Sequence, residues 1–116
     1  MSDKIKQWKC KYLSDTIASG TSSAELDLLG GTLVSIITPA SLASTTFTIT
    51  VSDISGGTFL TCKDPINAGT TRTFTVAASG YYDIPPAITA GMRYIKVVFG
   101  SSETAKTIKY GIRNID

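Results

Sequence analysis

Alternation of apolar and polar residues recurs along the chain and predicts β-strands. It is clearest at residues 45–52, where Phe47, Ile49 and Val51 occupy every second position and threonine or serine fills the positions between them. Successive side chains of a strand point to opposite faces, so this period of two is typical of a strand with one buried and one solvated face. Threonine suits the solvated face because it is both polar and β-branched.

Further segments show the same alternation, or an apolar run bounded by turn residues. They predict strands at residues 24–29, 32–38, 57–63, 71–77, 81–84, 93–99 and 105–112. Pro85-Pro86 ends one strand, and residues 87–91 predict a single helical turn. About eight short strands separated by turns predict an all-β fold, as one antiparallel β-sandwich or jelly-roll-like domain. An up-and-down barrel is the alternative.

The N-terminal segment differs from the rest of the chain and predicts an arm or edge strand over residues 1–13, ahead of a sandwich domain over residues 14–116. Aromatic and basic residues alternate there, which would give a strand one aromatic face and one basic face. Such a strand is suited to a partner surface. The alternative is an edge strand whose lysines prevent edge-to-edge pairing. The candidate interface residues are Lys4, Lys6, Trp8, Lys9, Lys11 and Tyr12.

Composition narrows the class of protein. The chain has 116 residues, which favours one domain, with 42% hydrophobic residues and a net charge of +2. The hydrophobic content is too high for a disordered tail, and the charge is low for a nucleic-acid-binding protein. No apolar run approaches the ~20 residues of a membrane-spanning helix. Residues 1–6 lead into a charged stretch without an apolar core, so we expect no secretory signal.

The chain offers little material for catalysis. It contains no histidine, which excludes Ser-His-Asp and Cys-His arrangements. Cys10 and Cys62 are the two cysteines, and two thiolates without histidine are too few for a structural zinc site. Without an oxidising compartment we expect both to be free thiols. We therefore expect no enzyme activity, no catalytic residues, no cofactor and no metal ion.

Tyrosines near the ends of predicted strands form a second candidate site. Tyr81, Tyr82 and Tyr94 could make a surface aromatic patch if they shared one face. Such a patch could bind a glycan, whereas packing at the rim of the core, with the hydroxyl in water, is the simpler interpretation. A carbohydrate-binding module displayed on a larger particle is therefore one alternative function.

The order of segments resembles a family of small β-sandwich virion proteins of tailed bacteriophages and prophages. The most characteristic part is Gly91-Met92-Arg93-Tyr94-Ile95-Lys96, which follows a proline-containing turn. The other matching segments, in order, are residues 16–23, 26–28, 30–31, 33–40, 46–49, 56–59 and 75–79.

The resemblance implies a structural role without catalytic residues. Family members resemble capsid decoration (cement) proteins or other head-associated proteins, so the expected partner is the major capsid protein. The resemblance also implies a homo-oligomer, such as a trimer or dimer, located on the capsid surface of the virion and assembled in the bacterial cytoplasm. No nucleic-acid or membrane partner is expected. A tail, neck or fibre-associated protein is the alternative within the virion.

Overall fold

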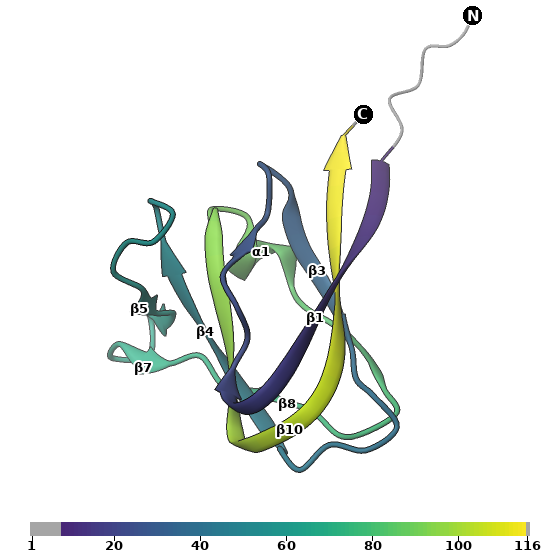
Figure 1. Cartoon of the computed structure of the whole chain (residues 1–116). Helices are drawn as coiled ribbons and strands as arrows, with labels where there is room; N and C mark the ends of the chain where they lie inside the picture. The colour runs from purple at the N-terminus through teal and green to yellow at the C-terminus, as the bar shows by residue number, and fades with distance from the viewer. Residues whose placement is uncertain (1–7, 116) are drawn as a thin grey trace, which may run out of the picture.

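The computed structural model describes residues 8–115, with only the backbone described for Trp8, Lys9 and Ile115. Strands account for most of this part of the chain (Figure 1). They are β1 (Trp8–Ser22), β2 (Leu26–Asp27), β3 (Thr32–Ile37), β4 (Thr46–Ser52), β5 (Leu60–Thr61), β6 (Lys63–Asp64), β7 (Thr70–Thr71), β8 (Phe74–Thr75), β9 (Tyr81–Asp83) and β10 (Tyr94–Ile115). The helical turn predicted at residues 87–91 is present as α1 (Pro86–Thr89).

Strand β10 organises the fold. The sequence predicted two strands, at residues 93–99 and 105–112, but the structure has one strand running from Tyr94 to Ile115. Its first part pairs with β4, and its second part lies between β1 and β3. Ala105 lies between the two predicted segments with a left-handed φ of 53°, yet the pairing with β1 keeps its register across it, with Thr104 opposite Ser19 and Lys106 opposite Ile17. The register shifts instead between Gly20 and Ser22 of β1, opposite residues 98–103 of β10, so the strand bends there without ending.

Strand β1 bends together with β10. It pairs with β10 from Trp8 to Ser22, and its register shifts between Gly20 and Ser22. Gly20 has φ of 117°, a conformation that glycine adopts without the strain of a side chain. The paired ends of β1 and β10 extend together at the top of the view in Figure 1. Strand β1 therefore crosses the boundary predicted after residue 13 without a break.

Eight strands form one curled antiparallel sheet. Its order is β5-β4-β10-β3-β9, with β1 and β2 paired to β10 and β8 paired to β4 (Figure 1). Strands β6 and β7 form a separate hairpin. The prediction of an all-β antiparallel fold is confirmed. The division into two sheets that a sandwich requires is not confirmed, because the bent β10 joins both halves through continuous backbone pairing.

Three of the predicted strands are shorter than the sequence indicated, and residues 24–29 contribute only β2. Residues 57–63 contribute only β5 and β6, and residues 71–77 contribute only β8 beside the end of β7. Between β5 and β6, the backbone N–H of Cys62 donates to Ile49 O at 2.8 Å, and Cys62 O accepts from Arg72 N at 2.9 Å. The chain thus leaves β4 at this point, so each pairing ends after two residues.

The core lies on the concave side of the curled sheet. Before Ala105 the buried positions of β10 are odd-numbered, and after it they are even-numbered. Thr89 of α1 is fully buried and donates a hydrogen bond from Oγ1 to Leu33 O at 2.6 Å, which ties the helical turn to β3. The buried apolar residues are Ile17, Leu26, Leu28, Leu33, Ile36, Phe47, Ile49, Val76, Ile84, Met92, Ile95, Val97, Phe99, Ile108, Tyr110 and Ile112.

A buried carboxylate anchors the bend of β10. Glu103 is 1% exposed and accepts hydrogen bonds from Ala43 N (3.1 Å), Ser44 N (2.7 Å) and Ser44 Oγ (2.5 Å). Burial by itself raises the pKa of Glu103, but these bonds from Ser44 and Ala43 outweigh it and hold the pKa below its usual value. The segment before β4 is therefore fixed to the bend by an ionised side chain. Nothing local in the sequence indicates this role for Glu103.

Candidate protein-binding surface

The convex face of the sheet between β1 and β9 carries the most distinctive surface of the described chain. Directly opposite residues of antiparallel strands point to the same face. The register therefore places Cys10 beside Arg113 and Tyr12 beside Gly111, and on the other side of β10 it places Gly111 beside Ser35. Ser35 and Gly111 stand next to the core residues Ile36, Tyr110 and Ile112 along their strands, so this set of positions belongs to the face of the sheet opposite the core.

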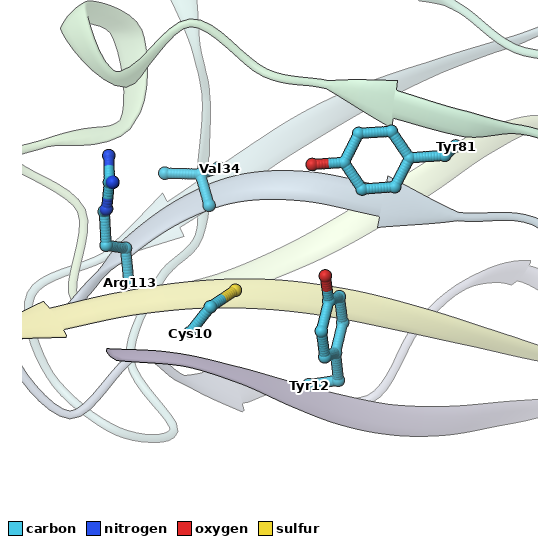
Figure 2. Close-up of a pocket in the computed structure, with 5 residues that line it drawn as sticks. All are labelled: Cys10, Tyr12, Val34, Tyr81 and Arg113. Atoms are coloured by element: carbon cyan, nitrogen blue, oxygen red, sulfur yellow. The ribbon is translucent and has the colours of Figure 1, made fainter. Parts of the chain in front are cut away.

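An open depression of about 340 Å³ lies on this face (Figure 2). We call it the outer-face depression, and its lining residues are Cys10, Tyr12, Val34, Tyr81 and Arg113. In Figure 2 the ring of Tyr12 rises from β1 across β10 towards Tyr81 of β9. Tyr12 is 49% exposed and Tyr81 is 63% exposed, so both rings are available to a partner.

Gly111 forms the floor beneath Tyr12. A Cβ at position 111 would lie 2.0 Å from Ser35 Oγ and 3.3 Å from Tyr12 Cε1. The space that a side chain would fill is therefore taken by Ser35 and by the tyrosine ring, an arrangement in which an aromatic residue covers a cross-strand glycine. Ser35 is fully buried, and its hydroxyl has no hydrogen-bond partner among the described residues.

A bulge in β3 adds an apolar residue to the depression. Gly111 pairs with Ser35 and Ile112 pairs with Leu33, which leaves Val34 as the extra residue of β3. Val34 lines the depression. The next pairs along the same face are Lys109 with Ile37, and Ile37 with Tyr81. The face is thus aromatic and apolar at its centre, with the cations of Arg113 and Lys109 on β10.

The depression offers side chains suited to contacts with a protein. The pKa of the Tyr12 phenol is raised, chiefly by its hydrogen bond with Cys10. The lining residues offer two phenol hydroxyls, a thiol, an aliphatic side chain and a guanidinium. Tyrosine and arginine are the residue types that dominate the energy of protein–protein contacts.

The predicted N-terminal interface is described only in part. Lys4 and Lys6 lie outside the described residues, and for Trp8 and Lys9 the structure gives the backbone at the start of β1. Tyr12 lies on the convex face. Lys11 pairs with the inward-facing Ile112, so it lies on the concave side of β1 although it is exposed. Tyr12 and Lys11 therefore belong to opposite faces of the strand.

The structure separates the three tyrosines of the predicted aromatic patch. Tyr81 and Tyr82 are consecutive residues of β9 and point to opposite faces, so Tyr81 is exposed while Tyr82 packs against the core. Tyr94 belongs to the half of β10 that pairs with β4, where the guanidinium of Arg93 lies 4.8 Å from the centre of its ring. Tyr81 instead shares the outer-face depression with Tyr12.

Sequence reasoning missed Val34, Arg113 and Cys10 as neighbours of Tyr12. The alternation in the N-terminal segment put Cys10 on the same strand face as Tyr12, but nothing local connects it to residues near the C-terminus. Both cysteines are free thiols, with Cys10 exposed and Cys62 half-buried against the core. Among residues 8–115 there is no group of three acidic or cysteine side chains that could hold a metal ion. Within the same range, no helix is long and apolar enough to span a membrane.

Comparison with known proteins gives one informative likeness. No protein-family model matches the chain, and no curated protein matches it. Among solved structures, the crystal structure of the SPBc2 prophage-derived protein YomS superposes with a TM-score of 0.60. The chain is similar in fold to a prophage protein. The likeness covers 98% of this chain and 99% of YomS at 13% sequence identity, so it concerns the whole fold and the fold alone.

Proposed function

We propose that this chain is a structural protein of a bacteriophage virion, and specifically a capsid decoration protein without enzyme activity. The observation that supports it most is the end-to-end fold likeness to a prophage-derived protein. A tyrosine-lined depression with an arginine at its rim is the second support, because it is suited to a protein partner.

The proposed partner is the major capsid protein of the assembled head. A protein that binds the assembled shell, and not its unassembled subunits, stabilises the shell by mass action. Tyr12 and Tyr81 would act as the buried anchors of the contact, with Arg113 lining the depression beside them. The contacts of many copies on one particle would reinforce one another through multivalency, so each single contact can be weak.

The basic N-terminal residues have a separate role in this proposal. Lys4, Lys6, Lys9 and Lys11 concentrate positive charge in the N-terminal sequence, and the backbone of residue 9 pairs with Asn114, next to Arg113. Charges at the edge of a contact mainly raise the association rate and orient the partner. We expect them to steer the chain towards an acidic surface of the shell.

Binding to isolated shells tests the proposal. Heads of the phage or prophage that encodes this chain are prepared without it, incubated with the purified chain and sedimented. We expect Tyr12→Ala with Tyr81→Ala to weaken binding at least about tenfold, the size expected when anchor residues are truncated. Tyr94→Ala is the matched control, since it removes a tyrosine from the other half of β10 and should leave binding unchanged.

Deletion of residues 2–7 tests the basic segment, because it leaves all of β1 in place. We expect the deletion to lower the rate of association with the shells. The reduction should be larger at low salt than at high salt, because salt screens charges at the edge of a contact. Equal binding by the double tyrosine variant and the parent chain would contradict the proposed contact.

Electron cryo-microscopy of the complete particle separates the remaining functions. Density for the chain at symmetry positions on the capsid surface would agree with decoration. Density in the tail, neck or fibres would assign the same fold to a different part of the virion. Absence from the particle, together with glycan binding that Tyr12→Ala and Tyr81→Ala abolish, would favour a carbohydrate-binding module.

A further inference from the structure

Strand β1 has an unpaired edge. It pairs with β10 along one side, and none of the other strands within residues 8–115 pairs with its opposite side. Residues 10, 11, 12, 14 and 16 are exposed along this edge. An exposed edge presents backbone N–H and C=O groups to any extended segment, and proteins commonly protect such edges with charged side chains.

The charges on this edge have opposite signs and a symmetric placement. Lys11, Leu13 and Asp15 pair with Ile112, Tyr110 and Ile108 of β10, so all three lie on the concave side of β1. Leu13 is half-buried against the core, with one charge two residues before it and the other two residues after it. Asp15 also accepts a long hydrogen bond of 3.3 Å from the backbone N–H of Ala24.

We propose that β1 pairs antiparallel with β1 of a second copy of this chain, about a two-fold axis centred on Leu13. In this register Leu13 faces Leu13 of the second copy. Lys11 faces Asp15 of the second copy, and the same pair occurs again on the other side of the axis. An isologous contact of this kind uses one patch twice and closes as a dimer.

The neighbouring registers are less favourable. Centring the pair on Tyr12 places Lys11 opposite Leu13, and centring it on Ser14 places Leu13 opposite Asp15. Each of these sets a charge against an apolar side chain and leaves both Lys11–Asp15 pairs of the favoured register unmade. Centring on Tyr12 sets Lys9 opposite Asp15 instead, but only with Lys11 against Leu13. Directly opposite ions of unlike sign stabilise a strand pair, whereas like charges destabilise it. The two charges therefore oppose pairing with an unrelated strand and favour pairing with this one.

The contact would be weak in isolation. Pairing over residues 10–16 supplies several backbone hydrogen bonds, whereas a typical stable interface has about ten in addition to a buried apolar centre. Copies held close together on a larger assembly would pair far more readily, because their effective concentration is high. The inference concerns the chain alone, so it can fail without affecting the proposed capsid binding, and the reverse also holds.

Disulfide crosslinking tests the axis. In a Cys10→Ser background, Leu13→Cys places a thiol opposite its own copy, and we expect a crosslinked dimer under mild oxidation. Ser14→Cys is the matched control, because in this register position 14 faces Tyr12 and not itself. Crosslinking of Leu13→Cys no greater than that of Ser14→Cys, with both variants folded by circular dichroism, would overturn the proposal.

Charge reversal tests the ion pairs without changing Leu13. We expect Lys11→Asp to raise the dimer dissociation constant in sedimentation by at least about tenfold, since two attractive pairs become repulsive. Adding Asp15→Lys to this variant should restore the parent value, and Lys63→Asp on the separate hairpin should leave it unchanged. A parent chain that stays monomeric up to about 1 mM would refute the pairing. So would a double variant whose dimer dissociation constant is no lower than that of Lys11→Asp.

Discussion

Replacing Glu103 by glutamine changes one buried charge and almost nothing else. The carboxylate accepts two hydrogen bonds on Oε2, from Ser44 N and Ser44 Oγ, and one on Oε1, from Ala43 N. The amide oxygen of glutamine can keep the two bonds from Ser44. Its NH₂ group then faces the N–H of Ala43, so the donor of a partly buried hydrogen bond loses its acceptor.

The size of the effect follows from these bonds. Bonds to a charged acceptor contribute about 1.5–3 kcal/mol each, against about 0.5–1.5 kcal/mol for neutral ones, and an unpaired buried donor costs about 1–3 kcal/mol. We expect Glu103→Gln to lower the free energy of unfolding by about 2–4 kcal/mol at pH 7. A chain of this length has about 6–17 kcal/mol in total, so the variant stays folded.

Urea unfolding followed by circular dichroism measures this loss. The midpoint should fall by about 1–3 M, given the usual slope for small proteins. Glu25→Gln is the matched control, because Glu25 also accepts from a serine hydroxyl and a backbone N–H, those of Ser55 and Gly56, but lies at the surface. Its midpoint should move less than half as far.

The difference between parent and Glu103→Gln should also depend on pH. The pKa of Glu103 is lower in the folded chain than in the unfolded one, so its contribution is complete above the unfolded value and is lost as the pH falls through the folded value. The gap between the two curves should be constant above about pH 5.5 and should narrow as the pH falls below the unfolded value. Equal midpoints at pH 7, or a gap that does not narrow in acid, would refute the role assigned to the ionised carboxylate.

Three further substitutions address packing and thiol reactivity. Gly111→Ala should destabilise the fold by about 1–3 kcal/mol through overpacking, and combining it with Ser35→Ala should recover part of the loss in a double-mutant cycle of unfolding free energies. Tyr110→Phe should leave thermal stability unchanged or raise it slightly, because the buried hydroxyl has no hydrogen-bond partner among the described residues; a large loss would contradict this. Cys10 should react with a thiol reagent well before Cys62, whose thiol pKa is raised by burial, and Cys10→Ser should remove the fast phase.

Local patterning predicted most elements whose two faces differ in environment. Strands β3 and β4 lie within one residue of the predicted segments, and the helical turn begins at Pro86, one residue before its predicted start. In β4, Phe47 and Ile49 are buried while Thr46 and Thr48 are only partly so, as the alternation indicated. Such patterns are readable because burial on one face imposes its own period on the sequence.

The candidate surface was predictable only at single positions. Alternation with Lys9 and Lys11 identified Tyr12 as a residue on one face of an N-terminal strand. Its neighbours Val34, Tyr81 and Arg113 come from three other strands, and only the pairing of β1 with the end of β10 brings them together. The grouping of Tyr81 with Tyr82 failed because adjacent residues of a strand point to opposite faces.

By itself, the sequence determined that the chain is all-β, where most strands lie and which of their faces is buried, because these properties depend on side chains close together in the chain. Tertiary structure alone decided that residues 94–115 form one bent strand, that eight strands close into one curled sheet, and that Glu103 is buried and ionised. Each of these depends on contacts between distant segments, such as Ala43 and Ser44 with Glu103. In the sequence, the break in the pattern around Ala105 looks like the end of a strand. Only the pairing of Thr104 and Lys106 with β1 shows that the strand continues through this left-handed residue.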